Sequence, residues 1–327
     1  MICNINNSLI SGISACVPKK KIFNSKLKNL SNKKKYIALT GVKERYFNKN
    51  ISASNLCLNA ANKLIKKLKW KKKDIKFLIF VSQTRDHVLP STACKLQDLL
   101  GLEKDVVAFD VPLGCSGYIY GLYLSFLLSE NLKKKGLLLA GDSLSKVLDP
   151  DNPNLEALFG DAGTATAINY LKSKNINNYF SLNTDGSKYE KLIVKKTNNK
   201  TKEYLYMDGK AIFDFSINEV PKQIKDITKN IKVKLKDINY FIFHQANKFL
   251  VDTIVDKLNI SNKKTLFSLK KFGNTNSASI PITMLINSKL IKNSNLLLSG
   301  FGVGLSWGTC YIKNQKKFKT VFSKYDK

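Results

Sequence analysis

The segment Asp110-Val-Pro-Leu-Gly-Cys-Ser-Gly117, together with the apolar run behind it, decides the fold. Residues 106–111 predict a strand, and two glycines flank Cys115 in the turn that follows. Residues 115–129 then carry apolar side chains almost all the way round a helix, which is typical of a helix covered on all sides. A helix of this kind lies between two sheets, so the segment predicts a layered α/β sandwich with a helix in its middle.

Other apolar runs predict the strands of those sheets. Residues 77–81, 137–140, 240–243 and 296–299 are short and continuously apolar, as in strands covered on both faces. Residues 52–68 instead place apolar side chains on one face and lysines on the other, which predicts an outer amphipathic helix.

The chain also contains a weak internal repeat. Residues 73–83 resemble residues 236–246, and residues 137–143 resemble residues 296–302, at the nearly equal offsets of 163 and 159. Two matches at similar offsets indicate a duplicated unit, and chance similarity of apolar strands is the alternative. We therefore expect an N-terminal half at residues 1–171 and a C-terminal half at residues 172–327.

The charge of the chain is strongly positive, with a net value of +31, yet only two of its 55 basic residues are Arg. Arg is the residue that makes bidentate contacts with bases and phosphates, and the lysines are spread over the whole chain. This pattern favours a compositional bias over a nucleic-acid groove. An acidic protein partner is the electrostatic interpretation that we prefer.

Several classes of protein are disfavoured by composition. The six cysteines form no CxxC pair, so neither a disulfide scaffold nor a zinc ribbon is supported, and a reducing cytoplasm fits. Two histidines are too few for a multi-histidine metal site. The longest apolar stretch, residues 118–128, is too short to span a bilayer, and no signal peptide is recognised at the N-terminus. We expect a cytoplasmic protein without membrane insertion.

Cys115 and His244 are the first candidates for chemistry. Cys115 lies at a strand-to-helix turn, where the helix dipole favours an anion and lowers a thiol pKa. A buried Cys that acts as a small apolar residue is the alternative. His244 lies at the end of a buried strand and is followed by Gln245 and Asn247, whereas a structural core His is the alternative there.

Two glycine-containing segments are further candidates. Gly273-Asn-Thr-Asn276 is by default a polar turn. Residues 300–308 contain four glycines after a buried strand but lack the P-loop Lys and the dinucleotide fingerprint. Backbone N–H groups of this loop could therefore hold either a phosphate or an oxyanion.

Together these segments resemble the thiolase-fold condensing enzymes, and among them the β-ketoacyl-acyl-carrier-protein synthase III family. The resemblance covers nearly the whole chain. Its marks follow in order: Thr40-Gly-Val-Lys-Glu-Arg45, Pro90-Ser-Thr-Ala-Cys94, the Cys115 segment, Phe159-Gly-Asp161-Ala-Gly, Asp185-Gly-Ser, His244-Gln-Ala-Asn, Gly273-Asn-Thr and Gly302-Val-Gly304. The resemblance implies a thiolase-like duplicated αβαβα five-layer sandwich and a homodimer.

The resemblance also implies the reaction and the residues that carry it. Cys115 would attack a thioester and become acylated, and the backbone N–H groups of Cys115 and Val303 would hold the oxyanion. His244 and Asn274 would stabilise the enolate formed when malonyl carrier protein loses CO2, and the acyl group would then condense with it. No metal and no cofactor are implied, because the substrates are an acyl-coenzyme A or acyl carrier protein and malonyl carrier protein.

The sequence departs from the family at the expected donor site. Lys35, Leu39, Pro153 and Phe249 stand where the resemblance leads us to expect aromatic and cationic contacts with coenzyme A. We expect Phe213, Leu89, Phe249 and Lys248 to take part in substrate binding, with Phe213 in the substrate tunnel and Leu89 at the partner subunit's acyl pocket. These differences predict a primer other than plain acetyl-coenzyme A.

Two other functions stay open from the sequence. A Cys-dependent acyltransferase of a specialised pathway would pass the acyl group from Cys115 to an amine or an alcohol. A non-catalytic basic binding protein would keep the fold without the chemistry, although the retained Cys115, His244 and Asn274 argue against this class.

Overall fold

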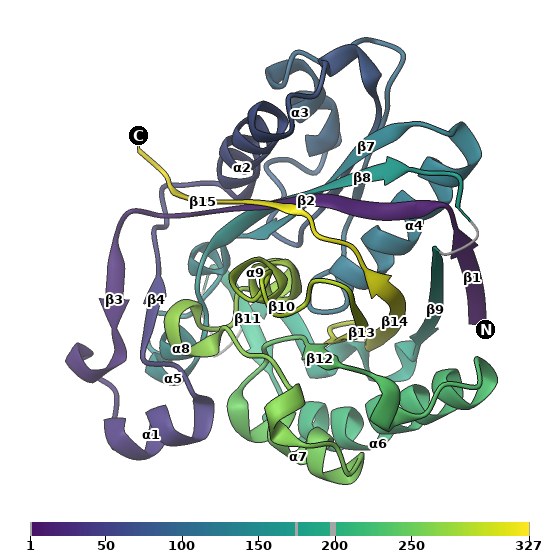
Figure 1. Cartoon of the computed structure of the whole chain (residues 1–327). Helices are drawn as coiled ribbons and strands as arrows, with labels where there is room; N and C mark the ends of the chain where they lie inside the picture. The colour runs from purple at the N-terminus through teal and green to yellow at the C-terminus, as the bar shows by residue number, and fades with distance from the viewer. Residues whose placement is uncertain (1, 174–175, 197–200, 327) are drawn as a thin grey trace.

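The computed structural model describes residues 2–173, 176–196 and 201–326, which form two main sheets and the helices around them (Figure 1). The first sheet has the order β15 (Lys319–Lys324), β2 (Ser8–Val17), β8 (Ala162–Tyr170), β7 (Lys135–Asp142), β5 (Ile75–Val81) and β6 (Val107–Val111). The second has the order β1 (Ile2–Asn6), β9 (Asn177–Thr184), β14 (Ser306–Gln315), β13 (Ser294–Gly302) and β12 (Tyr240–Phe243). Two small two-stranded sheets pair β3 (Lys21–Phe23) with β4 (Glu44–Tyr46) and β10 (Leu192–Lys196) with β11 (Glu203–Met207).

Helices form three layers around the two sheets. In Figure 1, α2 (Ala53–Leu68) and α3 (Thr92–Leu99) lie outside the first sheet, whereas α6 (Gly209–Asn230) and α7 (Lys248–Lys257) lie outside the second. The central helices α4 (Gly117–Leu132) and α9 (Ser279–Ile286) contact strands of both sheets. The remaining helices are α1 (Lys33–Thr40), α5 (Pro153–Leu158) and α8 (Leu269–Phe272). This arrangement confirms the predicted five-layer sandwich.

The strand pairing confirms the duplication that the internal repeat predicts. In the first sheet β7 pairs with β5 in parallel and with β8 in antiparallel orientation. In the second sheet β13 pairs in the same two ways with β12 and β14. The repeated segments thus occupy equivalent strands of the two sheets.

The two ends of the chain cross between the sheets. The N-terminal strand β1 pairs with β9 of the second sheet, and the C-terminal strand β15 pairs with β2 of the first. Each sheet therefore contains a strand from the other end of the sequence. The boundary at residues 171 and 172 stays a prediction.

Local sequence explains the outer and central helices differently. Helix α2 begins after Ser52, whose side chain accepts a hydrogen bond from the Asn55 N–H and so caps the first turn. Helix α4 has no such cap and is held by burial of Tyr118, Ile119 and Leu122 between the sheets. Among the described residues, none of the helices is long and apolar enough to cross a membrane.

The expectation that α4 is covered on all sides is wrong for part of the helix. Leu127 is 39% exposed and Leu132 is 36% exposed. The sheets cover only two flanks of the helix, so side chains near its C-terminal end that point along the sheets stay open to solvent.

Candidate active site

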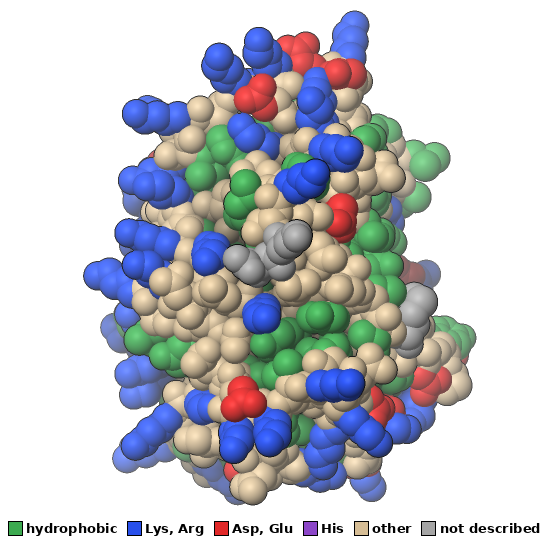
Figure 2. Space-filling model, turned by 45° about the vertical axis from the view of Figure 1, so that its right-hand side comes forward, with side chains coloured by type: hydrophobic (Ala, Val, Ile, Leu, Met, Phe, Trp, Pro, Cys, Tyr) green, Lys and Arg blue, Asp and Glu red, His purple; other side chains and the backbone are tan. Residues whose placement is uncertain are grey.

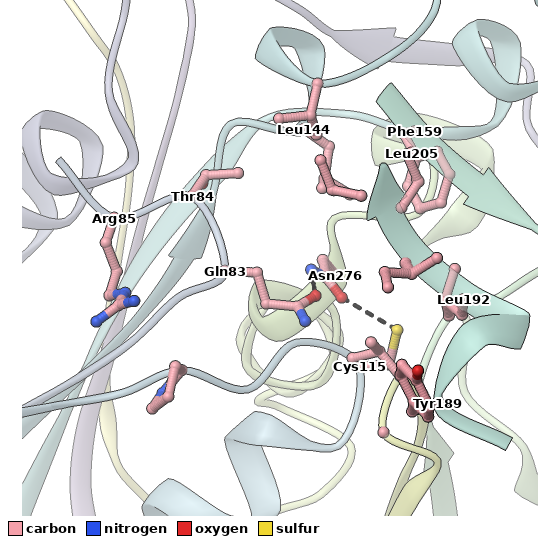
Figure 3. Close-up of a pocket in the computed structure, with 16 residues that line it drawn as sticks. Gln83, Thr84, Arg85, Cys115, Leu144, Phe159, Tyr189, Leu192, Leu205 and Asn276 are labelled. Carbon is pink, nitrogen blue, oxygen red and sulfur yellow. Dashed lines mark hydrogen bonds between the residues drawn. The ribbon is translucent and has the colours of Figure 1, made fainter. Parts of the chain in front are cut away.

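Cys115 lies in the turn between the edge strand β6 and the central helix α4 (Figure 3). Its side chain is almost fully buried, with 9% exposure. The glycine-rich loop after β13 packs directly against it, because a Cβ placed on Gly302 would lie 2.8 Å from the Cys115 Sγ atom. Gly302 also has a φ of +153°, a backbone conformation that glycine adopts readily. The sulfur is thus enclosed by its own turn and by the loop after β13, and the loop can approach this closely because Gly302 has no side chain.

The thiol of Cys115 is held in its protonated form by burial. Desolvation raises its pKa to about 12, and backbone hydrogen bonds from Val303 and from Cys115 itself act in the opposite direction. The sequence predicted a lowered pKa from the helix N-terminus. The pKa is raised instead, because excluding water from the thiolate destabilises it more than the dipole of one helix end stabilises it. In the resting protein the S–H group donates to Asn276 Oδ1 at 3.1 Å.

The two predicted oxyanion donors both lie next to this sulfur. The backbone N–H groups of Val303 and Cys115 are the hydrogen-bonding groups that favour its anionic form. A carbonyl bonded to the sulfur would place its oxygen near the same pair of donors. Geometry of this kind suits a tetrahedral intermediate.

His244 follows β12 and is buried with a neutral ring. Its Nδ1 atom lies 2.8 Å from the Ser279 Oγ atom, and the ring packs edge-on against Phe301 at 5.8 Å between centroids. Burial lowers the pKa of His244 to about 3, while a backbone hydrogen bond with Asn276 acts in the other direction. A neutral imidazole carries one N–H, so His244 is suited to donate a single hydrogen bond.

Asn274 is fixed by hydrogen bonds on three sides. Its backbone N–H donates to the Leu158 carbonyl at 2.9 Å, and its carbonyl accepts from Gly160 N–H at 3.0 Å. Its Oδ1 atom accepts from Asn276 N–H at 2.9 Å, which leaves Nδ2 directed towards the Ala246 carbonyl at 3.5 Å. The amide N–H2 group therefore lies beside the His244 segment with its orientation set.

The three predicted catalytic residues meet around Asn276. The Asn276 side chain contacts the Cys115 thiol, its N–H contacts Asn274, and its backbone contacts His244. Cys115 also lines a pocket of about 380 Å³. Most of the pocket wall is apolar, including Leu144, Phe159, Leu192 and Leu205, and Figure 3 shows these side chains around the thiol.

The predicted substrate-binding residues lie outside the wall of this pocket in the described part of the chain. Phe213 and Phe249 stack on each other between α6 and α7, with ring centroids 5.5 Å apart. Lys248 pairs with Asp252 and lies over the Phe267 ring. Leu89 is 84% exposed. The roles of these four residues in binding stay predictions.

Sequence reasoning missed several residues that build the site. Asp142 is fully buried and accepts hydrogen bonds from Gln83 N–H at 2.8 Å and from the Ser277 hydroxyl at 2.6 Å. Gln83 and Asn276 bond to each other at 3.2 Å, and Ser279 holds His244. Two features of the sequence could have identified them. Asp142 follows the apolar run at residues 137–140, and Asn276 belongs to the polar turn Gly273-Asn-Thr-Asn276.

Fold and site together define a condensing enzyme of the thiolase-like class. A family model described as 3-oxoacyl-[acyl-carrier-protein (ACP)] synthase III matches residues 109–186, and one for the C-terminal part of the same proteins matches residues 228–314. The chain is 35% identical to a β-ketoacyl-[acyl-carrier-protein] synthase III of Streptococcus agalactiae, across 84% of this chain and 88% of that one. The chain belongs to the 3-oxoacyl-[acyl-carrier-protein] synthase III family.

Further relatives agree over almost the full length. A β-ketoacyl-[acyl-carrier-protein] synthase III of Clostridium perfringens is 31% identical across 94% of this chain and 100% of that one. The crystal structure of a 3-oxoacyl-(acyl-carrier protein) synthase of Burkholderia xenovorans LB400 superposes with a TM-score of 0.92. It is 32% identical, and the match covers 98% of this chain and 99% of that one.

Metal ligands are not grouped in the described residues. Within residues 2–173, 176–196 and 201–326, no cluster of three or more His, Cys, Asp or Glu side chains could hold a metal ion. The groups described at the site are the thiol, the imidazole, the side-chain amides and the backbone N–H groups.

Proposed function

We propose that this chain condenses an acyl group on Cys115 with malonyl carrier protein and releases CO2, as a step of acyl-chain biosynthesis. The observation that carries the proposal is the position of one buried thiol under two backbone N–H donors, beside a neutral His and a fixed Asn amide. The apolar pocket next to the thiol has room for the acyl chain.

In the first step the Cys115 sulfur attacks the carbonyl carbon of an acyl thioester. The new S–C bond forms as the bond to the donor sulfur breaks, and the thiol proton ends on the departing donor thiol. The backbone N–H groups of Cys115 and Val303 hold the oxyanion in between. The reaction needs no cofactor, because one thioester replaces another.

In the second step malonyl carrier protein loses CO2 under the control of His244 and Asn274. The Ser279 hydroxyl accepts from Gln245 N–H at 3.4 Å and lies 2.8 Å from His244 Nδ1. We assign the hydroxyl as the donor to Nδ1, so that the ring proton is on Nε2. Nε2–H and Asn274 Nδ2–H then donate to the thioester oxygen. The bond between the carboxylate carbon and the α-carbon breaks, and its electrons move onto the thioester oxygen. The two N–H donors stabilise the enolate that forms.

The enolate carbon finally attacks the acyl group on Cys115. A carbon–carbon bond forms, the bond to the Cys115 sulfur breaks, and the thiolate takes up a proton from solvent, because its first proton left with the donor thiol. The product is a 3-oxoacyl carrier protein. Because Cys115, His244 and Asn274 all contact Asn276, the enolate carbon and the acyl group would be held close together.

We further propose that an acyl carrier protein is the partner, and that the active form is a cytoplasmic homodimer. Figure 2 shows more Lys and Arg than Asp and Glu side chains on one face, scattered among neutral and apolar ones, and this excess suits an acidic partner. The end strand β6 leaves Val107 43% exposed, and Val88 and Leu89, in the loop between β5 and α3, are 83% and 84% exposed. A second copy would cover such an apolar edge.

The test uses the purified chain with acyl carrier protein, acetyl-coenzyme A and malonyl carrier protein, and follows the acyl groups by mass spectrometry. Condensation predicts a 3-oxoacyl carrier protein and released CO2. Transfer of the acyl group to an added amine or alcohol, with malonyl carrier protein unchanged, would establish an acyltransferase instead. Absence of any acyl group on Cys115 would favour a binding protein.

The primer is the part of the proposal that departs from family expectation. We propose that carrier-bound primers of medium length load Cys115 faster than acetyl-coenzyme A. The support is Lys35, Leu39, Pro153 and Phe249 at the donor site, together with the largely apolar pocket wall. Loading of Cys115 by micromolar acetyl-coenzyme A, but not by longer acyl carriers, would contradict this proposal.

A further inference from the structure

A pair of side-chain amides lies against the Cys115 thiol, and the proposed reaction has so far given it no role. The thiol donates to Asn276 Oδ1 at 3.1 Å, and Asn276 Nδ2 donates to Gln83 Oε1 at 3.2 Å (Figure 3). Both amide side chains also line the pocket that would hold the acyl chain. The pair therefore contacts the reacting atom.

The fold makes space for this pair and holds its two ends. A Cβ on Gly114 would lie 2.1 Å from Gln83 Oε1 and 2.8 Å from Asn276 Nδ2. The two amides therefore occupy the space that a side chain at position 114 would fill. Asp142 accepts from Gln83 N–H through Oδ1 and from the Ser277 hydroxyl through Oδ2. One buried carboxylate thus fixes both loops through groups other than the two side-chain amides.

The backbone of Asn276 suits this position. Its φ is +49°, in the left-handed region that Asn tolerates better than most residues. Its N–H and carbonyl groups are directed to Asn274 and His244, so the side chain alone faces the sulfur. A change of the side chain can therefore be separated from a change of the backbone contacts.

The sulfur changes from a hydrogen-bond donor to an acceptor during the reaction. The resting thiol has a proton to give, whereas the thiolate and the acyl thioester have none. An amide presents an oxygen on one side and an N–H2 group on the other. Rotation by half a turn about the last side-chain bond therefore converts Asn276 from acceptor to donor without moving its backbone.

We propose that Asn276 is a further catalytic residue, which accepts from the Cys115 thiol at rest and turns to donate N–H to the sulfur when the proton has left. Gln83 is the positioning residue that turns with it, so that each amide keeps a partner in both states. The inference rests on the proposed function for its acylation step, since the thiol proton leaves to the donor thiol there.

The rotation of Asn276 supplies a further hydrogen-bond donor to the buried thiolate. Burial disfavours the anion, and a third donor beside the Val303 and Cys115 N–H groups lowers that penalty. At rest the same residue gives the S–H group a partner, so no buried polar group is left without one. The pair thus acts on formation of the thiolate and not on loss of CO2.

The test measures alkylation of Cys115 by iodoacetamide between pH 6 and pH 10, with the site of labelling identified by peptide mass. Asn276→Gly removes both functions and fits the left-handed backbone. Asn276→Asp keeps an acceptor and removes the donor. We expect both variants to be labelled at least tenfold more slowly than the native protein at pH 8, with the profile displaced to higher pH.

Gln83→Met removes the partner of Asn276 without adding charge, so we expect its labelling to slow by a smaller factor than in the Asn276 variants. Gly186→Ala is the matched control, because nothing lies within 4 Å of a Cβ at that position, and it should be labelled at the native rate. A native pH profile in either Asn276 variant would overturn the proposal, and Asn276→Asp decides alone if Asn276→Gly does not fold. Iodoacetamide is no substrate, so failure of the proposed condensation would leave this result readable.

Discussion

The proposed nucleophile and the proposed decarboxylation pair form the two sides of one site, and burial acts on Cys115 and His244 in opposite senses. Cys115 enters from the N-terminal sheet, where burial raises its pKa to about 12 and opposes the thiolate. His244 enters from the C-terminal sheet, where burial lowers its pKa to about 3 and keeps the ring neutral. A dry site therefore suits a neutral donor directly, whereas the thiol needs added hydrogen-bond donors.

Removing the nucleophile should separate the two sides most strongly. Cys115→Ala is expected to reduce condensation by at least about a thousandfold, because no acyl-enzyme can form. Loss of CO2 from malonyl carrier protein should persist, since His244 and Asn274 are untouched. Radiolabelled CO2 release and product mass measure the two activities on the same sample. Equal loss of both activities would contradict the division of the site.

Removing either His244 or Asn274 should slow CO2 release and leave the reactivity of Cys115 unchanged. His244→Ala and Asn274→Ala are each expected to slow CO2 release by about 10²- to 10³-fold, the usual cost of one fixed donor. Iodoacetamide labelling of Cys115 serves as the control and should stay close to native. Undiminished CO2 release from both variants would remove these residues from the decarboxylation step.

A methyl group added at Gly302 should slow acylation of Cys115 without affecting His244 and Asn274. The added Cβ of Gly302→Ala would lie 2.8 Å from the Cys115 sulfur, so the thiol must move, and acylation should fall by about tenfold or more. Gly186→Ala is the matched control, because nothing lies within 4 Å of a Cβ at that position. Single-turnover loading followed by intact-protein mass compares them. Equal loading by both variants would show that the sulfur has more freedom than this geometry allows.

Salt should change the encounter with the carrier more than the chemistry. Surface lysines act mainly on association with an acidic partner, and this attraction is screened by ions. We expect the apparent KM for malonyl carrier protein to rise severalfold between 20 and 150 mM salt, with little change in kcat. Steady-state kinetics with a small thioester as control tests this, and a flat KM would leave only compositional bias as the reason for the lysines.

The smallest effect is predicted for pH. Because the pKa of His244 is lowered to about 3, CO2 release by Cys115→Ala should stay flat between pH 5.5 and pH 8. Below about pH 6.5 the unfolded chain gains a proton on this residue that the folded chain does not take. The contribution of His244 to stability therefore falls as the pH decreases towards 3. A rate that follows a group near pH 6.5 would contradict a neutral buried His244.

Local pattern was sufficient for the layers and the duplicated strands, whereas the three candidate catalytic residues were assigned through the resemblance to the family. The apolar surround of residues 115–129 predicted the central helix, and the repeated strands predicted two equivalent sheets. Cys115, His244 and Asn274 were identified through motifs of the family. Each of these features is encoded within a few neighbouring residues.

Features that depend on distant contacts were not predictable in this way. Gln83 and Asn276 are 193 residues apart in sequence and meet where Asp142 accepts hydrogen bonds from both loops. The sign of the Cys115 pKa shift follows from burial by several loops and outweighs the local helix end. The exchange of β1 and β15 between the sheets likewise has no signal in the strands themselves.

A pulse–chase experiment on the acyl group tests the central claim most directly. The chain is loaded with an isotopically labelled acyl carrier protein, freed from donor, and then mixed with malonyl carrier protein. We predict that the label is first found on the Cys115 peptide and is then recovered in a 3-oxoacyl carrier protein, with one CO2 for each acyl group. Label that never reaches Cys115, or that stays there after malonyl carrier protein is added, would contradict the account.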